Sequence, residues 1–184
     1  MPELSSAPQP PTATTPSVLE RMLGYRIFYV LSVAIFATDQ ITKVWIHHTL
    51  PFRTFGPPDH IEVIPGFFNL VHVGNTGAAW SLFEGRSTLL ALLALGTLLA
   101  IFLWRRSLGL RAMPVQVSFG LMCGGIVGNL VDRLLHGHVI DFLDFHFGNY
   151  IFPTFNIADS GICVGVFIYL WFSFRHPAAL TEQP

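Results

Sequence analysis

The residues of this sequence that could do chemistry are a few aspartates, asparagines and basic side chains set into or beside long apolar stretches. Asp39 and Lys43 are four residues apart, so on a helix they share one face and can form an ion pair. Asn129, Asp132 and Arg133 repeat this arrangement on a second apolar stretch. Burying an ionisable group in a membrane costs several kcal/mol unless it is paired, so such groups are by default functional candidates.

Three further polar residues also lie near the ends of apolar stretches. Asp159 lies just after Asn156 at the start of the last apolar stretch, and Asp141 lies in a short loop before it. Asn75 opens a polar and small-residue stretch that ends at Trp80, in which Trp80 fits an interfacial anchor and Asn75 a hydrogen-bond donor to a ligand. All of these groups lie at the ends of apolar stretches on one side of the expected membrane. We therefore expect them to meet at one depth, near that surface.

The composition excludes most soluble proteins. Charged residues make up 11% of the 184-residue chain, against about 25% in soluble domains. Hydrophobic residues make up 52%. So few charges cannot cover the surface of a soluble globule of this size, and the excess apolar surface must face lipid. The net charge of −1 gives no basic surface for nucleic acid.

The apolar runs predict the elements that position these residues. A bilayer is crossed by roughly 20 residues of helix. Four membrane helices are predicted, at about residues 24–46, 87–104, 112–133 and 155–174, with outer loops at 47–86 and 134–154. In the first outer loop, β-prone runs flank Pro65 and Gly66 and favour a hairpin. The expected fold is an all-α integral membrane protein with four transmembrane helices and a small β-rich extracytoplasmic subdomain in the first outer loop.

Basic residues predict how the chain crosses the membrane. They are more numerous beside one set of helix ends, at Arg21, Arg26, Arg105, Arg106, Arg111 and Arg175. By the positive-inside rule this side is cytoplasmic, which places both termini in the cytoplasm and the polar groups near the outer face. Residues 20–176 are expected to form one membrane-embedded domain, between a disordered cytoplasmic tail at 1–19 and a short cytoplasmic tail at 177–184.

Small residues predict where helices approach closely. Gly120, Gly124 and Gly128 form a stripe on the third predicted helix, and Gly161 and Gly165 form one on the fourth. Such faces let backbones pack together in lipid. We expect them to bring the end of the third helix close to the start of the fourth.

Neither the cysteines nor the histidines predict a metal centre. Cys123 and Cys163 lie inside apolar runs without ligand spacing and fit small core residues. Seven of the eight histidines are scattered through the outer loops without an H-E-x-x-H motif or a Cys/His cluster. We therefore expect no metal site, with a zinc site as the alternative.

Five motifs stand together in one order and carry a family resemblance: D-Q-I-T-K at 39–43, N-T-G-A-A-W at 75–80, G-G-I-V-G-N-L-V-D-R at 124–133, V-I-D-F at 139–142 and F-N-I-A-D at 155–159. Over roughly residues 25–174 the chain resembles the bacterial lipoprotein signal peptidases, the signal peptidase II family. Each motif alone is weak, but five in this order, with four apolar runs at matching positions, are highly specific.

The resemblance implies an intramembrane aspartic endopeptidase that removes the signal peptide from diacylglyceryl-modified prolipoproteins, cutting just before the lipidated cysteine. The family's catalytic pair, carried over by motif, falls on Asp141 and Asp159. The residues expected to bind substrate or support the pair are Asn75, Gly77, Asn129, Arg133, Asn156, Asp39, Lys43 and Asp132. Asp144 is of the right type and depth to compete with Asp141 but lies outside the motif.

Such a pair has a defined chemistry. Two adjacent carboxyl groups cannot both ionise, so one keeps a proton near neutral pH. The ionised group takes a proton from water while the protonated one donates a hydrogen bond to the scissile carbonyl. The resemblance further implies a bacterial inner-membrane location, no cofactor, the prolipoprotein signal peptide and membrane lipid as partners, and a monomer.

The alternative function is a small membrane transporter or channel, with Asp39, Asp132 and Asp159 as a cation or proton path. That reading predicts polar residues at the bilayer midplane and often repeated, broken helices. The middle of each predicted helix is apolar and no repeat is visible, so the peptidase is preferred.

Overall fold

A computed structural model describes residues 23–105, 107–110 and 112–176, so the predicted tails at 1–19 and 177–184 lie outside the described residues. Its helices are α2 (Arg26–Thr49), α3 (Ser87–Trp104), α4 (Met113–His136) and α5 (Ile157–Arg175). All four are long and apolar enough to cross a membrane, as predicted, and each helix lies within a few residues of its expected range. A short 3-10 helix, η1 (Ala79–Ser81), precedes α3.

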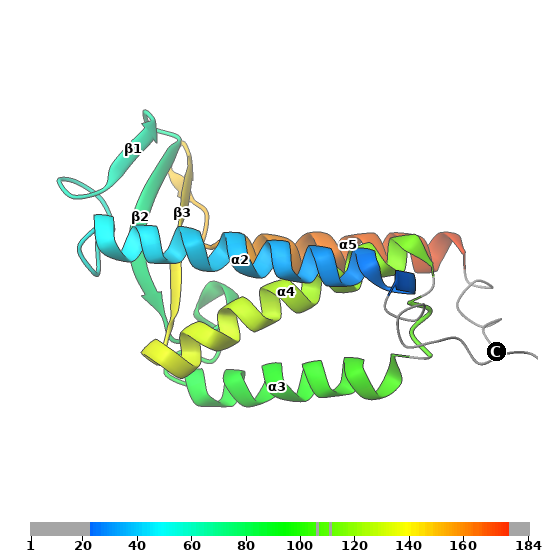
Figure 1. Cartoon of the computed structure of the whole chain (residues 1–184). Helices are drawn as coiled ribbons and strands as arrows, with labels where there is room; N and C mark the ends of the chain where they lie inside the picture. Colours follow the sequence, from blue (N-terminus) through cyan, green and yellow to red (C-terminus); the bar gives the residue numbers. More distant parts are fainter. Residues whose placement is uncertain (1–22, 106, 111, 177–184) are drawn as a thin grey trace, which may run out of the picture.

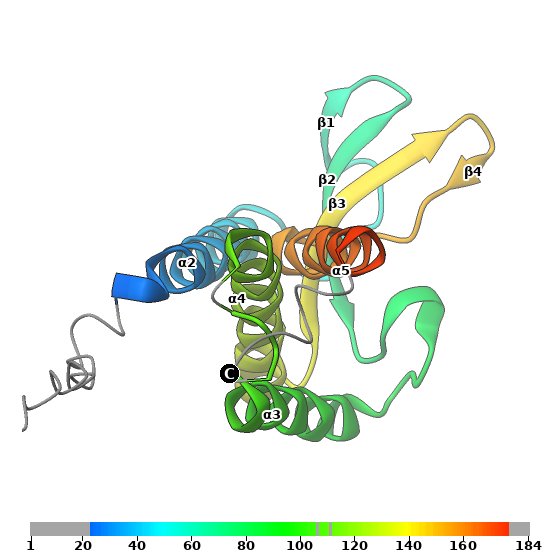
Figure 2. The same cartoon turned by 90° about the vertical axis from the view of Figure 1, so that its right-hand side faces the viewer.

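The helices are arranged around α4 (Figures 1 and 2). Viewed along the bundle, α4 lies in the middle, with α2 and α5 on either side and α3 below. Buried residues occur along the whole length of α4, whereas most side chains of α3 are exposed. In a membrane, the exposed faces of the outer helices are the ones that meet lipid.

The two glycine stripes meet different helices: the α5 stripe packs against α4 as expected, a Cβ on Gly165 lying 2.6 Å from the carbonyl oxygen of Ser118, whereas the α4 stripe packs against α2. A Cβ on Gly124 would lie 2.5 Å from the carbonyl oxygen of Ser32 on α2, and one on Gly120 would lie 2.9 Å from Leu31 Cβ. The stripe therefore seats α2, while the neighbouring Gly125 faces the start of α5 at Ala158. Spacing predicted the close contacts but could not tell which neighbour each small face meets.

Beyond one end of the bundle lies a four-stranded antiparallel sheet in the order β1-β2-β3-β4 (Figure 1). Its strands are β1 (Ile61–Ile64), β2 (Phe68–Asn75), β3 (Val139–Phe147) and β4 (Tyr150–Ile151). The prediction that the β structure belongs to the first outer loop was therefore incomplete, because β3 and β4 come from the second. Asp141, expected in a loop, lies on β3 opposite Val73.

The sheet is anchored to the helices by a small apolar core. Ile140 and Phe142 of β3 pack with Ile46 and Leu50 at the end of α2. Burying Ile140 and Phe142 requires β3 to run along the helix ends. Asp141 lies between these two residues on the strand, so its side chain points to the opposite face. Gly137, with a φ of 74°, ends α4 and turns the chain into β3.

Candidate active site

Asp141 is held by two asparagine side chains. It is 2% exposed. Nδ2 of Asn156 donates to its Oδ1 at 2.7 Å, and Nδ2 of Asn75, from the end of β2, donates to its Oδ2 at 2.9 Å. Each carboxyl oxygen thus receives one amide hydrogen, which fixes the orientation of the group.

Asp159 is positioned by the first turn of α5. The side-chain oxygen of Asn156 accepts from the Asp159 backbone nitrogen at 2.9 Å, and Oδ2 of Asp159 accepts from the Asn156 backbone nitrogen at 3.3 Å. This reciprocal pair is a capping box at the start of the helix. Nδ2 of Asn129 on α4 donates to the other oxygen of Asp159 at 2.7 Å. Asn156 therefore connects the two aspartates directly.

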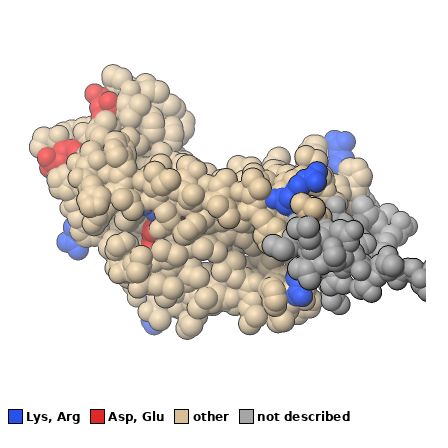
Figure 3. Space-filling view, viewed as in Figure 1, with Lys and Arg blue, Asp and Glu red and all other residues tan. Residues whose placement is uncertain are grey.

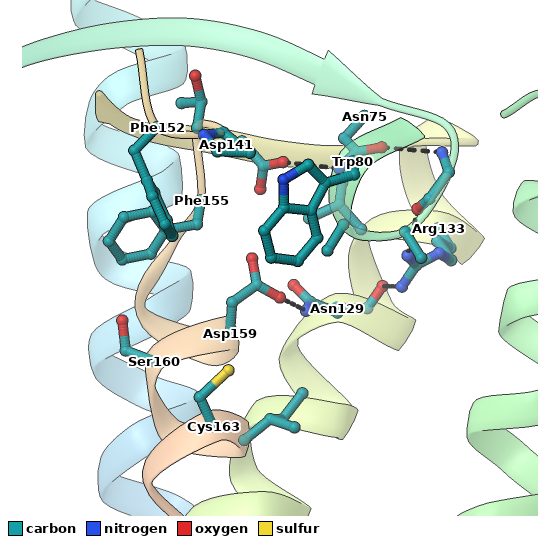
Figure 4. Close-up of a pocket in the computed structure, with 17 residues that line it drawn as sticks. Asn75, Trp80, Asn129, Arg133, Asp141, Phe152, Phe155, Asp159, Ser160 and Cys163 are labelled. Atoms are coloured by element: carbon teal, nitrogen blue, oxygen red, sulfur yellow. Dashed lines mark hydrogen bonds between the residues drawn. The ribbon is translucent and has the colours of Figure 1, made fainter. Parts of the chain in front are cut away.

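The two aspartates line one pocket of about 350 Å³. Figure 4 shows their carboxyl groups coming from different elements, Asp141 from β3 and Asp159 from α5. A second hollow of about 420 Å³ shares Asp141 in its lining and reaches Phe55 and Glu84. The first pocket is bounded by α4, α5 and the segment between β2 and α3, and its lining residues include Phe152, Phe155, Ile162 and Cys163.

Burial and charge favour a proton on this pair. Removal from water, and after it the nearby negative charge of Asp159, raise the pKa of the Asp141 carboxyl to about 7. The amide donors from Asn75 and Asn156 and the charge of Lys43 oppose the shift. Near neutral pH the site can therefore hold one proton while keeping one carboxylate, the state that acid–base chemistry on water requires.

A buried ionic network lies behind the pair. Nζ of Lys43 lies 2.8 Å from Oδ2 of Asp39 and 2.8 Å from Oδ2 of Asp132, and it donates to Oδ1 of Asn129 at 3.0 Å. The predicted Asp39–Lys43 pair is thus present, and Lys43 also joins α2 to α4. Both carboxylates and the ammonium group are at most 3% exposed, so each depends on the others for solvation.

This network reaches both elements that carry the pocket aspartates. Oδ1 of Asp39 accepts from the backbone nitrogen of Ala158, next to Asp159, at 2.9 Å. Oδ2 of Asp132 accepts from the backbone nitrogen of Ile140, next to Asp141, at 3.1 Å. The ion pairs therefore fix the separation of the two carboxyl groups through the main chain.

Arg133 holds the segment that borders the pocket. Its Nη2 donates to the carbonyl oxygen of Gly77 at 3.0 Å, while Oδ1 of Asn75 accepts from the Gly77 nitrogen at 2.8 Å. A Cβ on Gly77 would lie 2.7 Å from the carbonyl oxygen of Leu82, so only glycine allows this tight fold. Trp80 follows at a φ of 54°, is 67% exposed and lines the pocket.

The structure brings all ten predicted site residues together. Six line the pocket: Asn75, Gly77, Asn129, Arg133, Asp141 and Asp159. Asn156 bridges the two aspartates, and Asp39, Lys43 and Asp132 form the network behind them. Asp144 is not part of the pocket lining and contacts Asn69 and His146 instead.

Sequence reasoning missed three contributions. Gln40 donates to Asp132 at 3.1 Å and to Asp39 at 3.2 Å, and its place beside Asp39 was the available signal. Trp80, expected only as an interfacial anchor, lies against Phe152 at the mouth of the pocket, with ring centroids 6.4 Å apart. Phe152, which lines the pocket beside Phe155, belongs to none of the five motifs and gave no sequence signal.

Comparisons with known proteins agree with this site. The family model for signal peptidase (SPase) II matches residues 31–175. The chain is 41% identical over 156 residues to the lipoprotein signal peptidase of Oleidesulfovibrio alaskensis, covering 82% of this chain and 96% of that protein. It is 37% identical over 165 residues to that of a Nostoc species, covering 86% and 96%.

Two solved structures of bacterial membrane enzymes are similar to this chain in fold. One described as a bacterial membrane enzyme determined by the in meso method at 2.3 Å superposes with a TM-score of 0.73 at 31% identity, covering 85% of this chain and 93% of that one. A second, at 1.9 Å, gives a TM-score of 0.68 at 33% identity, covering 78% and 90%. The likeness therefore extends over the helices and the sheet together.

Proposed function

We propose that this chain, which belongs to the signal peptidase II family, cuts its substrate with Asp141 and Asp159 as the catalytic pair. The chain is a multi-pass membrane protease that removes signal peptides from prolipoproteins. One observation carries the assignment of the pair: two carboxyl groups from separate elements line one pocket, and Asn156 holds both.

The pair acts on water held between the two groups. The ionised carboxylate takes a proton from the water as its oxygen bonds to the scissile carbonyl carbon, and the protonated carboxyl donates a hydrogen bond to the carbonyl oxygen. A proton then passes to the amide nitrogen, the carbon–nitrogen bond breaks, and a carboxylic acid and a free amine leave. The single proton belongs to the pair, so base and acid are roles of the pair rather than of either residue.

The neighbouring amides and cations serve this chemistry from fixed positions. Asn75, Asn129 and Asn156 orient the carboxyl groups, and Asn75 and Asn129 also line the pocket, where their amides can meet a substrate backbone. Arg133 holds the Gly77 turn beside the pocket. Asp39, Lys43 and Asp132 act as positioning residues through the backbone next to each aspartate.

The two hollows that share Asp141 in their linings can each take one part of a diacylglyceryl substrate. The pocket wall made by Ile162, Cys163 and Phe152 suits the apolar signal peptide and the acyl chains. The hollow that reaches Thr76 and Glu84 is more polar and suits the chain beyond the lipidated cysteine. Both meet at Asp141, where the bond is cut.

The distribution of charge supports an orientation in a bacterial inner membrane. Arg26 begins α2, while Arg105 follows α3 and Arg175 ends α5, so all three lie at the bundle end away from the sheet. Figure 3 shows basic side chains at this end, further basic side chains below the sheet at the opposite end, and acidic ones over the sheet. By the positive-inside rule, the basic end and both termini are cytoplasmic, and the sheet and catalytic pair face outward.

A cleavage assay with matched substrates tests the proposed substrate. Purified protein in lipid vesicles is given a prolipoprotein with its cysteine diacylglycerylated and the same prolipoprotein without lipid. We expect cleavage immediately before the cysteine, seen by mass spectrometry, and at least about tenfold faster for the lipidated form. Equal rates for the two forms would overturn the assignment of the apolar wall to the acyl chains.

A further inference from the structure

A groove of about 550 Å³ lies in the half of the bundle away from the sheet. Its two walls are α2 and α3, and α4 forms its floor. Each wall helix packs against α4, whereas the two walls hardly touch one another, so the space between them stays open. This groove shares no lining residue with the pocket of Asp141 and Asp159, and the proposed catalysis does not use it.

Apolar side chains line both walls of this groove. Phe28, Val33 and Phe36 lie on the α2 side, and Leu98 and Ile101 lie on the α3 side. In a multi-pass protein these walls lie at membrane depth, where hydrocarbon rather than water surrounds the helices. A concave site with such a lining binds an apolar chain. We therefore expect hydrocarbon to fill the groove.

The groove is as deep as one leaflet of a bilayer. Its lining on α2 runs from Tyr25, just before the helix begins, to Phe36. At the rise of an α-helix this stretch is about 16 Å long. The hydrocarbon core of a bilayer is about 30 Å thick, so one leaflet contributes about 15 Å. This depth matches an acyl chain that enters from one surface, whereas a partner helix that crosses the membrane would extend beyond the groove.

A positive charge stands at the mouth of the groove. Arg105 directly follows α3 and lines the groove, and its guanidinium carbon lies 4.2 Å from the ring centroid of Phe102, another lining residue. Tyr25 and Tyr29 line the same end from α2. Arg and Tyr are side chains that suit the headgroup region, because each has an apolar body for the hydrocarbon and a polar tip for the surface.

In the part of the chain that the structure describes, no negative charge balances this mouth. The segments around it contain no Asp or Glu, at 23–38, 98–105, 107–110 and 112–131. Within the described residues, neither Arg105 nor Arg26, which lies next to Tyr25, forms an ion pair with a carboxylate. Basic side chains stand at this end of the bundle (Figure 3), and they complement an anionic headgroup.

We propose that the groove binds one anionic phospholipid from the leaflet at the basic end of the bundle. One acyl chain lies between α2 and α3, and the headgroup phosphate contacts Arg105. Most side chains of α3 are exposed, so α3 is the helix that gains most from a chain packed between it and α2. The lipid is a structural ligand that fastens α3 to the bundle, at a site separate from the one that takes the substrate.

The experiment uses the full chain, delipidated in detergent and titrated with phosphatidylglycerol or with phosphatidylcholine of the same acyl chains. Native mass spectrometry measures the lipid bound per chain, and thermal unfolding measures stability. We expect one saturable phosphatidylglycerol per chain, bound about fivefold more tightly than phosphatidylcholine, since one basic residue near an anionic headgroup contributes about that factor. The unfolding midpoint should rise further with phosphatidylglycerol. Equal affinity for the two lipids would overturn the proposal.

A pair of tryptophan variants locates the acyl chain. Val33→Trp fills the groove and should weaken phosphatidylglycerol binding at least about tenfold. Val44→Trp is the matched control, because Val44 lies on the same face of α2 about three turns nearer the sheet and outside the groove lining. Both valines are exposed, so either tryptophan can be accommodated. Equal binding by the two variants would overturn the placement of the chain.

A pair of arginine variants locates the headgroup. Arg105→Gln should remove the preference for phosphatidylglycerol over phosphatidylcholine, and Arg105→Lys should keep most of it. Arg175→Gln is the control, because Arg175 lies over Trp171 on α5, outside the groove lining, and it should keep the preference. A preference that survives in Arg105→Gln, or that is lost equally in Arg175→Gln, would overturn the proposal.

Discussion

Nδ2 of Asn156 lies 2.7 Å from Oδ1 of Asp141, while Oδ1 of Asn156 caps α5, the helix that carries Asp159. One side chain therefore sets the positions of both carboxyl groups. Because the cap and the donor are different atoms of Asn156, substitution can separate the structural contribution from the catalytic one.

Replacing Asn156 tests this division directly. Asn156→Ala loses the cap, at a cost of about 1 kcal/mol in stability, and also the donor to Asp141. A hydrogen bond to a charged group contributes about 1.5–3 kcal/mol, so cleavage should fall about 10- to 100-fold. Asn156→Ser restores the cap but not the donor, so its unfolding midpoint should recover while its cleavage rate stays low. Recovery of both would show that the residue acts only as a cap.

The turn at Gly77 gives a second prediction. A Cβ at this position would lie 2.7 Å from the carbonyl oxygen of Leu82, and relieving such overpacking costs about 1–3 kcal/mol. Gly77→Ala should therefore displace the turn that Arg133 and Asn75 hold and lower cleavage about tenfold. Gly56→Ala is the matched control, because a Cβ there meets nothing within 4 Å. Equal activity of the two variants in a cleavage assay would contradict the proposed role of the turn.

Removal of the buried ammonium group should be costly. Lys43→Met leaves Asp39 and Asp132 without their shared cation, and losing one partner of a buried ion pair costs about 3–5 kcal/mol. We expect a lower thermal unfolding midpoint in detergent and loss of cleavage. Adding Asp39→Asn and Asp132→Asn to the same variant removes the unpaired charges and should restore much of the midpoint. A triple variant as unstable as Lys43→Met alone would argue against the ionic account.

The pKa of Asp141 predicts how stability depends on pH. Burial raises it to about 7, whereas the unfolded chain has the ordinary value of about 3.9. Between these values the folded state binds more protons, so this group makes the free energy of unfolding fall as pH rises from about 4 to about 7. Cleavage should also decline above about pH 7, where the pair loses its proton. Asp141→Asn should abolish this part of the pH dependence in thermal unfolding, and an unchanged profile would contradict it.

The sequence predicted the membrane spans and the contact between Asp39 and Lys43, because both follow from local rules of hydropathy and helix spacing. It could not predict that Lys43 also contacts Asp132, since that contact depends on how α2 and α4 pack. The same limit explains the sheet. The strands of the two outer loops pair with each other, and this long-range register, with Val73 opposite Asp141, leaves no local signal.

Among the site residues, too, local contacts could be predicted from the sequence and long-range contacts could not. The capping pattern of Asn156 and Asp159 is local and readable in sequence, whereas the bond from Asn156 to Asp141 arises only when β3 crosses the start of α5.

Cleavage of a diacylglyceryl prolipoprotein by three aspartate variants tests the central claim most directly. Asp141→Asn and Asp159→Asn preserve shape and should each lower the rate at least about a thousandfold, because the two groups act as a unit. Asp144→Asn, on the same strand but bonded to Asn69 and His146, should keep most of the activity. Each variant is first shown to unfold at a temperature close to that of the unchanged protein. Full cleavage by the Asp141 or Asp159 variant would contradict the catalytic pair.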